Sequence, residues 1–484
     1  MVENVGAGAR GSLARRRYRM DLFVRLIRAL WVFGLIFLSY MIQLGMTQLL
    51  GIWERDPATG RDRRRLPRWL HRRGKRVDEV NARRLLRATL RLRGVYIKLG
   101  QVLSIMGGFL PRVYTKELEA LQDQVPPQPF HELEDTFFED FGRRPDELYA
   151  RIEEEPIAAA SLGQVHEAWL EDGTKAAVKV LYPGIREVIR VDMRVLRLAI
   201  VVYKWFFPVQ NIERVGDALV DLLHRETEYL HEAEMMERMA ANFAHAKDML
   251  FPEVVHELTT RNVLTMTFME GLKINRVEEM PERGIDPHAV AVRLVETFYE
   301  QLFVHRLFHA DPHPGNFLVQ PGRKPSRPKI VVLDFGAISE VRQEMVDGMV
   351  EVLQGVFDED RERLLRGFYQ MGFVSHGANR ELLERTVNTY FQKLLNIQDR
   401  TPGALMRANQ QELEALADPE VARDELRELM KSVDYPEGWF YVERASVLMF
   451  WLVGTIDPDV DAMRIGFPYV MPLLMQKRAE AGAS

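Results

Sequence analysis

The distribution of apolar residues divides this 484-residue chain into an uncharged segment, a mixed region and a mostly helical remainder. Residues 29–53, ALWVFGLIFLSYMIQLGMTQLLGIW, carry no charge and are long enough to cross a ~30 Å hydrocarbon layer as a helix. Trp31 and Trp53 stand near its two ends, as interfacial aromatic residues do. Three polar residues weaken a full span: Gln43, Thr47 and Gln48. A membrane span, a helix lying on the membrane surface and a helix buried in the fold therefore stay open.

Helical periodicity begins near residue 80, where apolar residues recur every three to four positions. The preceding residues, 55–76, are basic, contain Pro and Gly, and predict a linker. Further helices are predicted over residues 185–206, 212–245 and 287–306, and from residue 340 to the end, with loops between them.

Shorter apolar runs predict strands. Two of them flank Asp172-Gly173, which predicts a β-hairpin within residues 157–183. Residues 262–269 predict another strand, and the runs NFLVQ and KIVVLDFG on either side of a Pro-rich turn predict a second hairpin. A small mixed lobe followed by a mostly helical lobe is the resulting α+β fold class.

Charge is distributed unevenly along the chain. Up to Arg93, 22 Lys and Arg stand against seven Asp and Glu, although the whole chain has a net charge of −5. This asymmetry predicts a basic, surface-seeking N-terminal region on an acidic body. Because arginines crowd both flanks of the apolar segment, we expect anionic lipid headgroups rather than nucleic acid as its partner. The absence of cysteine excludes disulfides, thiolate metal sites and a Cys nucleophile.

The run FHADPHPGNFLV, residues 308–319, is too polar for ordinary core and carries the strongest chemical signal. Asp311 and Asn316 lie five residues apart in it, and Asp334 follows in VVLDFG. Phosphoryl transfer from ATP needs a carboxylate that orients or deprotonates the acceptor and oxygen ligands for Mg²⁺. The order Asp-x-x-x-x-Asn and then Asp-Phe-Gly supplies both, and Mg²⁺ prefers such hard oxygen ligands. The spacing therefore predicts a kinase-type catalytic loop.

A histidine metal site is the competing interpretation of the same run. His305, His309 and His313 are spaced by four, which would place them on one face of a helix. Pro312 and Pro314 argue against a helix continuing past His309. We therefore favour a loop in which His309 has a bracing role.

A kinase also needs a lysine on an upstream strand that anchors the nucleotide phosphates, and a helix glutamate that holds this lysine. The strand AAVKV places Lys179 in that position. Spacing alone leaves the partner open among five glutamates downstream: Glu226, Glu228, Glu232, Glu234 and Glu237. The phosphate-cradling loop before Lys179 is alanine-rich, IAAASLGQV, with Gly163 as its single glycine, which restricts positive φ angles.

Six ordered motifs carry a resemblance to the UbiB/AarF-type atypical kinases, from about Ala82 to about Gln476. They are KLGQ (98–101), AAAS (158–161), AAVKV (176–180), ETEYLHEA (226–233), HADPHPGN (309–316) and LDFG (333–336). The resemblance implies a protein-kinase-like bilobal α+β fold, with a small mixed N-lobe and a large helical C-lobe. It also implies an added N-terminal helical subdomain that bears the Lys-x-Gly-Gln motif.

The resemblance assigns roles residue by residue. Asp311 would be the catalytic carboxylate, Lys179 would pair with Glu232, and Asn316 and Asp334 would bind Mg²⁺. The loop Ala158, Ala159, Ala160 and Ser161 would contact ATP. A regulatory role is implied for Lys98, Gly100 and Gln101 of the Lys-x-Gly-Gln motif. The same role is implied for Glu226 and Glu228 of the family's Glu-x-Asp motif, in which Glu228 stands here in place of the Asp.

The implied function is that of a membrane-associated kinase or ATPase that uses ATP and Mg²⁺ and supports ubiquinone or other isoprenoid-lipid metabolism. A nucleotide-binding lipid chaperone or scaffold with incidental hydrolysis is the alternative. The expected location is a bacterial inner membrane with the kinase domain in the cytoplasm. Membrane lipids, including isoprenoid or quinone intermediates, are the expected partners, and a homodimer stays open.

The predicted organisation has six parts. They are a basic tail (1–28), a hydrophobic membrane segment (29–53), a basic linker (54–79), a helical Lys-x-Gly-Gln subdomain (80–150), a kinase-like N-lobe (151–272) and a kinase-like C-lobe with a helical extension (273–484).

Overall fold

The structure is a computed structural model of the whole chain. It describes residues 4–50, 52–55, 62–65, 67–105, 112–118, 121, 127–206, 212–358, 360–373 and 436–482. The chain divides into two compact units. The first comprises Met1–Leu133, Pro156–Gln164 and Leu181–Phe206, and the second comprises Glu134–Glu155, Val165–Val180 and Phe207–Ser484.

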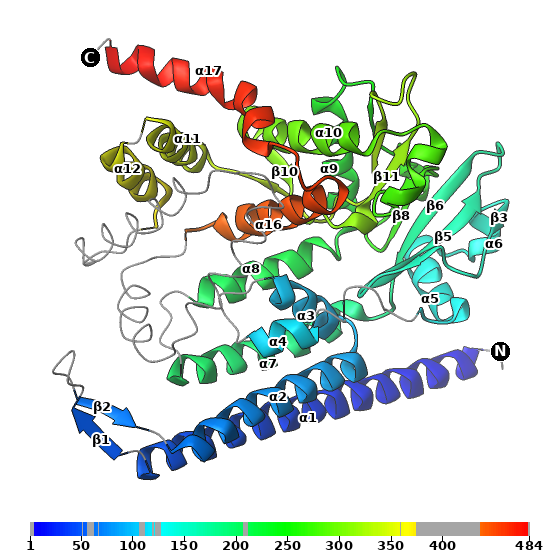
Figure 1. Cartoon of the computed structure of the whole chain (residues 1–484). Coiled ribbons are helices and arrows are strands. Elements are labelled where there is room, and N and C mark those ends of the chain that lie inside the picture. The colour runs from blue at the N-terminus through cyan, green and yellow to red at the C-terminus, as the bar shows by residue number, and fades with distance from the viewer. Residues whose placement is uncertain are drawn as a thin grey trace. The chain divides into compact units, whose positions relative to one another are not determined.

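The first unit is helical. Helix α1 (Asn4–Leu50) runs antiparallel beside α2 (Arg68–Leu92), and a hairpin of β1 (Ile52–Arg55) and β2 (Asp62–Arg65) lies between them in the chain (Figure 1). The other described helices of this unit are α3 (Val95–Ile105), α4 (Arg112–Leu118) and α7 (Ile185–Phe206). Helix α5 (Phe130–Phe141), between α4 and α7 in the chain, crosses into the second unit.

The prediction of a linker over residues 55–76 is wrong, because the β1–β2 hairpin and the first turns of α2 occupy this stretch. Five of its ten Lys and Arg lie in α2 and four of these are exposed, whereas Leu70 of the same helix is fully buried. A helix with one apolar stripe and a strongly charged outer face has the composition of a polar linker in a sequence. The break between α2 and α3 comes at Arg93 and Gly94, which both have a φ of 55°.

Helix α1 contains the apolar segment. Among the described residues, Leu22–Leu50 is the one candidate for a membrane span by length and composition, and 6% of its most apolar window is buried. The helix is continuous from Asn4, so residues before position 29 extend the same helix. Its buried contacts form a small core in which Ala29 packs with Leu92, Tyr96 and Val195.

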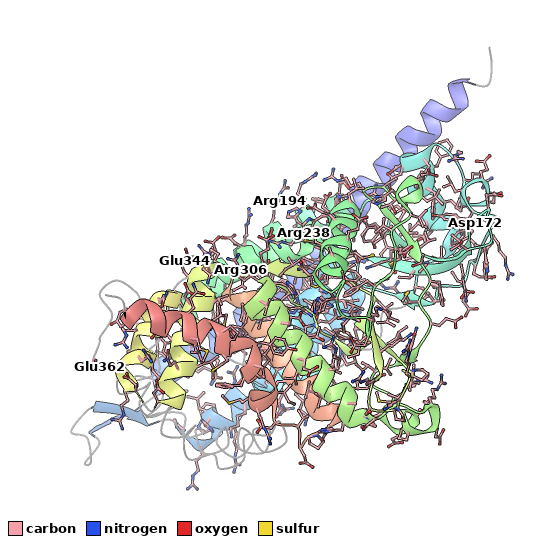
Figure 2. All side chains as sticks on the ribbon, turned by 90° about the horizontal axis from the view of Figure 1, so that it is seen from above. Asp172, Arg194, Arg238, Arg306, Glu344 and Glu362 are labelled. Carbon is pink, nitrogen blue, oxygen red and sulfur yellow. The ribbon has the colours of Figure 1, made fainter. Side chains whose placement is uncertain are left out.

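The second unit contains the sheets. Strands β3 (Arg151–Ile152), β5 (Gly163–Trp169), β6 (Lys175–Leu181) and β8 (Val263–Thr267) are neighbours in that order. The predicted hairpin is confirmed, with Asp172 at the tip between β5 and β6 (Figure 2). The strand predicted over residues 262–269 is also confirmed, as β8.

A further sheet has the order β7 (Met249–Leu250), β12 (Lys329–Val332), β11 (Phe317–Gln320) and β9 (Leu272–Lys273). The pair β11–β12 is the second predicted hairpin. Strand β10 (Leu307–His309) pairs antiparallel with β13 (Ile338–Glu340). The β10–β13 and β11–β12 pairings bring residues 308–319 and 330–338 together, because β10 and β11 belong to the first segment and their partners to the second.

The second unit also contains several described helices. They are α6 (Pro145–Leu148), α8 (Ile212–Arg225), α9 (Tyr229–Asn242), α10 (Pro287–Tyr299), α11 (Gln343–Phe357), α12 (Arg361–Met371), α16 (Trp439–Ile456) and α17 (Ala462–Gly482), and α10 continues into a π-helical turn, Glu300–His305. The prediction of one helix over residues 212–245 is wrong, because the chain turns at residues 226–228 and starts α9 anew. Residues 374–435 of the predicted helical remainder lie outside the described residues.

Candidate active site

A buried lysine between two carboxylates forms the centre of the candidate site. Lys179 Nζ lies 2.5 Å from Glu232 Oε1 and 3.1 Å from Asp334 Oδ2. The side chain of Glu232 is 1% exposed and that of Lys179 is 12% exposed, whereas Asp334 is 36% exposed. The ammonium is therefore fixed from the buried side by Glu232 and approached from the open side by Asp334.

Local structure explains why these three side chains meet. Lys179 lies in β6 between the fully buried Val178 and Val180, so its side chain projects from the opposite face of the strand. Glu232 lies in the first turn of α9, which begins after the turn at residues 226–228. Asp334 lies two residues after the end of β12, and the backbone N–H of Phe335 donates to Glu232 at 3.2 Å.

The charges of this cluster support one another. Burial alone would lower the pKa of the Lys179 ammonium, but the carboxylates of Asp334 and Glu232 outweigh it and raise that pKa above its ordinary value. Burial raises the pKa of Glu232, and the ammonium opposes that shift. Lys179 therefore stays protonated throughout the physiological range, as a group that binds phosphate oxygens must.

The loop after β10 holds Asp311 and Asn316 by local hydrogen bonds. Asn316 Nδ2 donates to the backbone carbonyl of Asp311 at 3.0 Å. The N–H of Asp311 donates to Nδ1 of His309 at 3.2 Å, and His309 is 2% exposed. These contacts give His309 the bracing role that was expected of it.

Asn316 and Asp334 are adjacent across the β11–β12 hairpin, because the N–H of Leu333 donates to the carbonyl of Asn316 at 3.0 Å. The amide oxygen of Asn316 and the carboxylate of Asp334 are hard oxygen donors. Such a pair suits Mg²⁺, which keeps several of its waters in protein sites. Asp334 is also oriented, since its Oδ1 accepts the N–H of Gly336 at 3.1 Å.

The competing interpretation, a metal site formed by His305, His309 and His313, is wrong. Among the described residues, no group of three or more His, Asp or Glu side chains could hold a metal ion. His305 ends a π-helical turn and lies 3.3 Å from Glu300, whereas His309 belongs to β10. His313 instead caps the turn Pro314–Asn316, where its Nδ1 accepts the N–H of Gly315.

Sequence reasoning missed Arg444, which lies in α16 and forms an ion pair with Asp311. Arg444 Nη2 lies 2.8 Å from Asp311 Oδ2, and the two side chains are 2% and 15% exposed. Nε and Nη1 of Arg444 are buried and have no hydrogen-bond partner within the described part of the chain. The available signal was an arginine next to Glu443 in the mostly apolar run FYVERASVLMFWLVG, because a buried arginine needs a partner.

The alanine-rich loop and the Lys-x-Gly-Gln motif belong to the first unit. Strand β4 (Ala158–Ala159) opens the loop, the N–H of Ala160 donates to the carbonyl of Gly163, and Ser161 is 7% exposed. In α3, Gln101 donates to the carbonyl of Leu121 at 2.9 Å. A Cβ on Gly100 would lie 2.3 Å from Leu121 Cδ1, so this glycine permits the close approach. Lys98 lies in the same helix.

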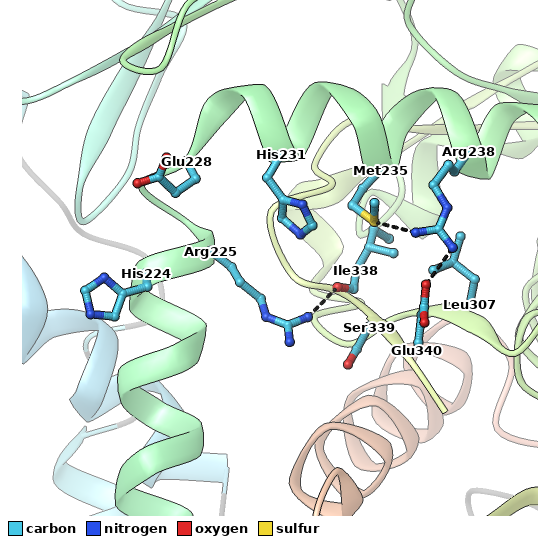
Figure 3. A pocket seen from close by; sticks show the side chains of 10 residues that line it. All are labelled: His224, Arg225, Glu228, His231, Met235, Arg238, Leu307, Ile338, Ser339 and Glu340. Carbon is cyan, nitrogen blue, oxygen red and sulfur yellow. Dashed lines mark hydrogen bonds and ion pairs between the residues drawn. The ribbon is translucent and has the colours of Figure 1, made fainter. Parts of the chain in front are cut away.

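Glu226 and Glu228 lie in the turn before α9. Glu228 forms a bidentate ion pair with the largely exposed Arg261, at 2.7 and 2.5 Å, so the longer side chain has a local partner. Glu228 also lines a cavity of about 460 Å³ between α8, α9 and the β10–β13 pair (Figure 3). Arg225 and Arg238 project into it in that view, paired with the carbonyl of Ile338 and with Glu340. No other predicted site residue lines this cavity.

Comparison with known proteins shows which family the chain resembles. Residues 120–368, about half of the chain, match the model of the ABC1 atypical kinase-like domain. The chain is 28% identical to the Arabidopsis thaliana chloroplastic protein ACTIVITY OF BC1 COMPLEX KINASE 8, over 83% of the chain and 55% of that protein. It is 33% identical to the Xenopus laevis AarF domain-containing protein kinase 1, over 59% of the chain and 55% of that protein. The chain thus spans about half of the length of these relatives.

A solved structure shows the same fold. It is the complex of Rv3197 with erythromycin from Mycobacterium tuberculosis, with a TM-score of 0.51 and 22% identity over 82% of this chain and 97% of that chain. The predicted protein-kinase-like α+β fold is thereby confirmed. The chain therefore belongs to the ABC1 atypical kinase-like family, the UbiB/AarF-type kinases that its motifs indicate.

Proposed function

We propose that this protein is a membrane-associated atypical kinase or ATPase that binds Mg-ATP and acts in ubiquinone or other isoprenoid-lipid metabolism. The observation that carries the proposal is the cluster in which Lys179 Nζ lies between Glu232 and Asp334. A strand lysine held by a helix glutamate is the group that anchors the nucleotide phosphates in kinases. If Lys179 were paired with only one of the two carboxylates, the contact would look the same as an ordinary structural ion pair.

The loop residues complete the chemistry. The Asp311 carboxylate is suited to orient or deprotonate the acceptor, which is a hydroxyl group or water. Mg²⁺, held by Asn316 and Asp334, would neutralise the charge of the phosphates. The lipid part of the proposal is supported by the family membership and by the exposed apolar helix α1 beside a basic one.

The proposal predicts Mg²⁺-dependent ATP hydrolysis that depends on Asp311. Asp311→Asn is expected to lower kcat by about 10²–10⁴-fold, the usual contribution of a positioned general base, while Mg-ATP still binds. Phosphate release and nucleotide binding are measured on the same full-length preparations. Because the neutral Asn leaves Arg444 without an anionic partner, Asp311→Glu is tested as well: it keeps the charge but moves the carboxylate by about one bond length. Displacement on that scale is also expected to cost about 10²-fold. Unchanged turnover in both variants would remove Asp311 from the mechanism.

One observation favours the second candidate, a nucleotide-binding scaffold or lipid chaperone. The Asp311 carboxylate is engaged by Arg444, and a carboxylate held by a guanidinium is less available as a proton acceptor. If the wild-type protein binds Mg-ATP but releases phosphate no faster than a protein-free control, the scaffold function is correct and the kinase function is not.

A further inference from the structure

Helix α1 has a polar inner face that is bound within the first unit. Ser39 and Gln43 lie 14 and 18 residues after Arg25, which places all three on one side of a helix with 3.6 residues per turn. Arg25 forms an ion pair with the buried Asp192 of α7, with 2.9 Å between Nε and Oδ1, and donates to the carbonyl of Leu92. Ser39 accepts from Asn81 at 2.7 Å, and Gln43 donates to the carbonyl of Leu70 at 3.3 Å.

Tyr40 extends this inner face. Its hydroxyl group lies 2.7 Å from Asp78 of α2 and 2.8 Å from the hydroxyl group of Tyr114 of α4. The polar contacts therefore extend from Arg25 to Gln43, about 27 Å of helix. They tie α1 to α2, α4 and α7 along most of its apolar segment.

The outer face of α1 is apolar and has no cover in the described structure of this chain. It is made of large side chains that are each at least 40% exposed: Phe23, Ile27, Leu30, Trp31, Leu38, Met41, Ile42 and Leu49. Gly34 and Gly45 lie between them, and a Cβ on either would meet no atom within 4 Å. From Phe23 to Leu49 this stripe is about 39 Å long. An apolar stripe of this length opposite a bound polar face is typical of a helix that lies at an interface.

The neighbouring helix excludes a span in this packing. Helix α2 carries nine Lys and Arg among 25 residues and lies beside α1. If α1 crossed the bilayer with α2 attached, these charges would enter the hydrocarbon, at a cost of about 2.5–3.5 kcal/mol for each central arginine. Detaching α2 would instead break the contacts of Ser39, Tyr40 and Gln43 with α2, and that of Arg25 with the carbonyl of Leu92.

We propose that α1 lies in the plane of an anionic lipid bilayer, with its outer face in the interface and the basic helix α2 packed on its inner face. Seven basic residues of α2 are exposed: Arg68, Arg72, Lys75, Arg76, Arg83, Arg87 and Arg91. Each contributes about 1 kcal/mol when it is near an anionic surface. The apolar outer face of α1 matches the acyl chains of such a surface, and the cationic helix behind it matches the phosphate headgroups. The inference rests on the proposed membrane association and specifies its geometry.

The test measures the depth of α1 at three points. Because the chain has no cysteine, Phe23→Cys, Leu38→Cys and Leu49→Cys each carry a single fluorophore on the outer face. Spin-labelled lipids in phosphatidylcholine–phosphatidylglycerol vesicles report its depth. The in-plane helix places all three probes at a similar shallow depth of about 5–10 Å. A deep probe at position 38 between two shallow ones, near the middle of a ~30 Å core, means a span and overturns the inference.

Charge provides an independent readout. Arg72→Ala and Arg76→Ala are each expected to weaken partitioning into these vesicles by about fivefold, the equivalent of about 1 kcal/mol. Arg283→Ala, an exposed arginine of the second unit, is the matched control and leaves partitioning unchanged. Equal partitioning of all three variants and the wild type overturns the role of α2.

Two further outcomes separate the inference from the proposed function. If the probes are shielded from water without vesicles and the protein is a dimer, a second copy covers the outer face and the inference is wrong. Absence of any vesicle binding overturns both this inference and the membrane association. Mg-ATP binding in vesicle-free solution tests the nucleotide function alone, since no probe position lies among its proposed residues.

Discussion

Replacing Asp334 with asparagine is expected to abolish the thermal stabilisation that Mg-ATP gives to the wild-type protein. A ligand at 100 times its Kd stabilises the folded state by about 2.7 kcal/mol, and each kcal/mol raises Tm by about 2–4 °C in a domain of this size. Asp334 is the carboxylate next to both Lys179 and Asn316, so the amide removes the charge that would hold Mg²⁺. Thermal unfolding with ATP, with and without Mg²⁺, measures the effect.

Asp172→Asn is the matched control for this variant. Asp172 lies at the exposed tip of the β5–β6 hairpin, where it accepts the N–H of Thr174 at 2.8 Å. The same chemical change there is expected to leave the Mg-ATP shift intact. The Asp334→Asn side chain still has an oxygen that accepts the N–H of Gly336, so the variant is expected to fold. If it binds Mg-ATP as well as the wild type, the assignment of Asp334 as a metal ligand is wrong.

Arg444→Met is expected to lower the free energy of unfolding by about 3–5 kcal/mol, because it removes one partner of a buried ion pair and leaves the other in place. Urea unfolding followed by tryptophan fluorescence measures the loss, since Trp439 and Trp451 lie in the same helix. ATP turnover is expected to fall as well, because Arg444 positions the Asp311 carboxylate. Arg444→Lys, which keeps the charge, is expected to restore part of both losses.

The exposed pair of Arg342 and Glu437 is the matched control, at 3.0 Å but with side chains 59% and 84% exposed. Arg342→Met is expected to cost no more than about 1 kcal/mol. Adding Asp311→Asn to Arg444→Met is expected to recover most of the lost stability, because the double variant buries no uncompensated charge. A loss for Arg444→Met no larger than that for Arg342→Met would show that the pair has no structural role.

The strands and the kinase-like loop could be predicted because their signals are local. An Asp-Gly turn between apolar runs specifies the β5–β6 hairpin, and a Pro-rich turn specifies the β11–β12 hairpin. The start of α2 could not, because a charged amphipathic helix and a polar linker have the same composition. The turn at residues 226–228 was missed for another reason. It depends on Arg261, whose guanidinium pairs with Glu228 and whose carbonyl accepts the N–H of Tyr229.

That turn also explains what spacing could not decide at the site. Five glutamates follow one another within twelve residues, and each is a possible partner of Lys179 by distance along the chain. The start of α9 sets the helical phase, which directs Glu232 inward and leaves Glu234 exposed. Arg444 was beyond prediction, because its pairing with Asp311 joins two segments that no local pattern connects.

The ion pair between Arg444 and Asp311 has a consequence for where this kinase-like domain ends. Similarity to the family model ends at residue 368, yet the guanidinium that holds the proposed catalytic carboxylate lies in α16. A fragment cut at the similarity boundary would retain every proposed nucleotide ligand and lose the side chain that aligns Asp311. The candidate site therefore includes a side chain from α16, outside the residues that match the family model.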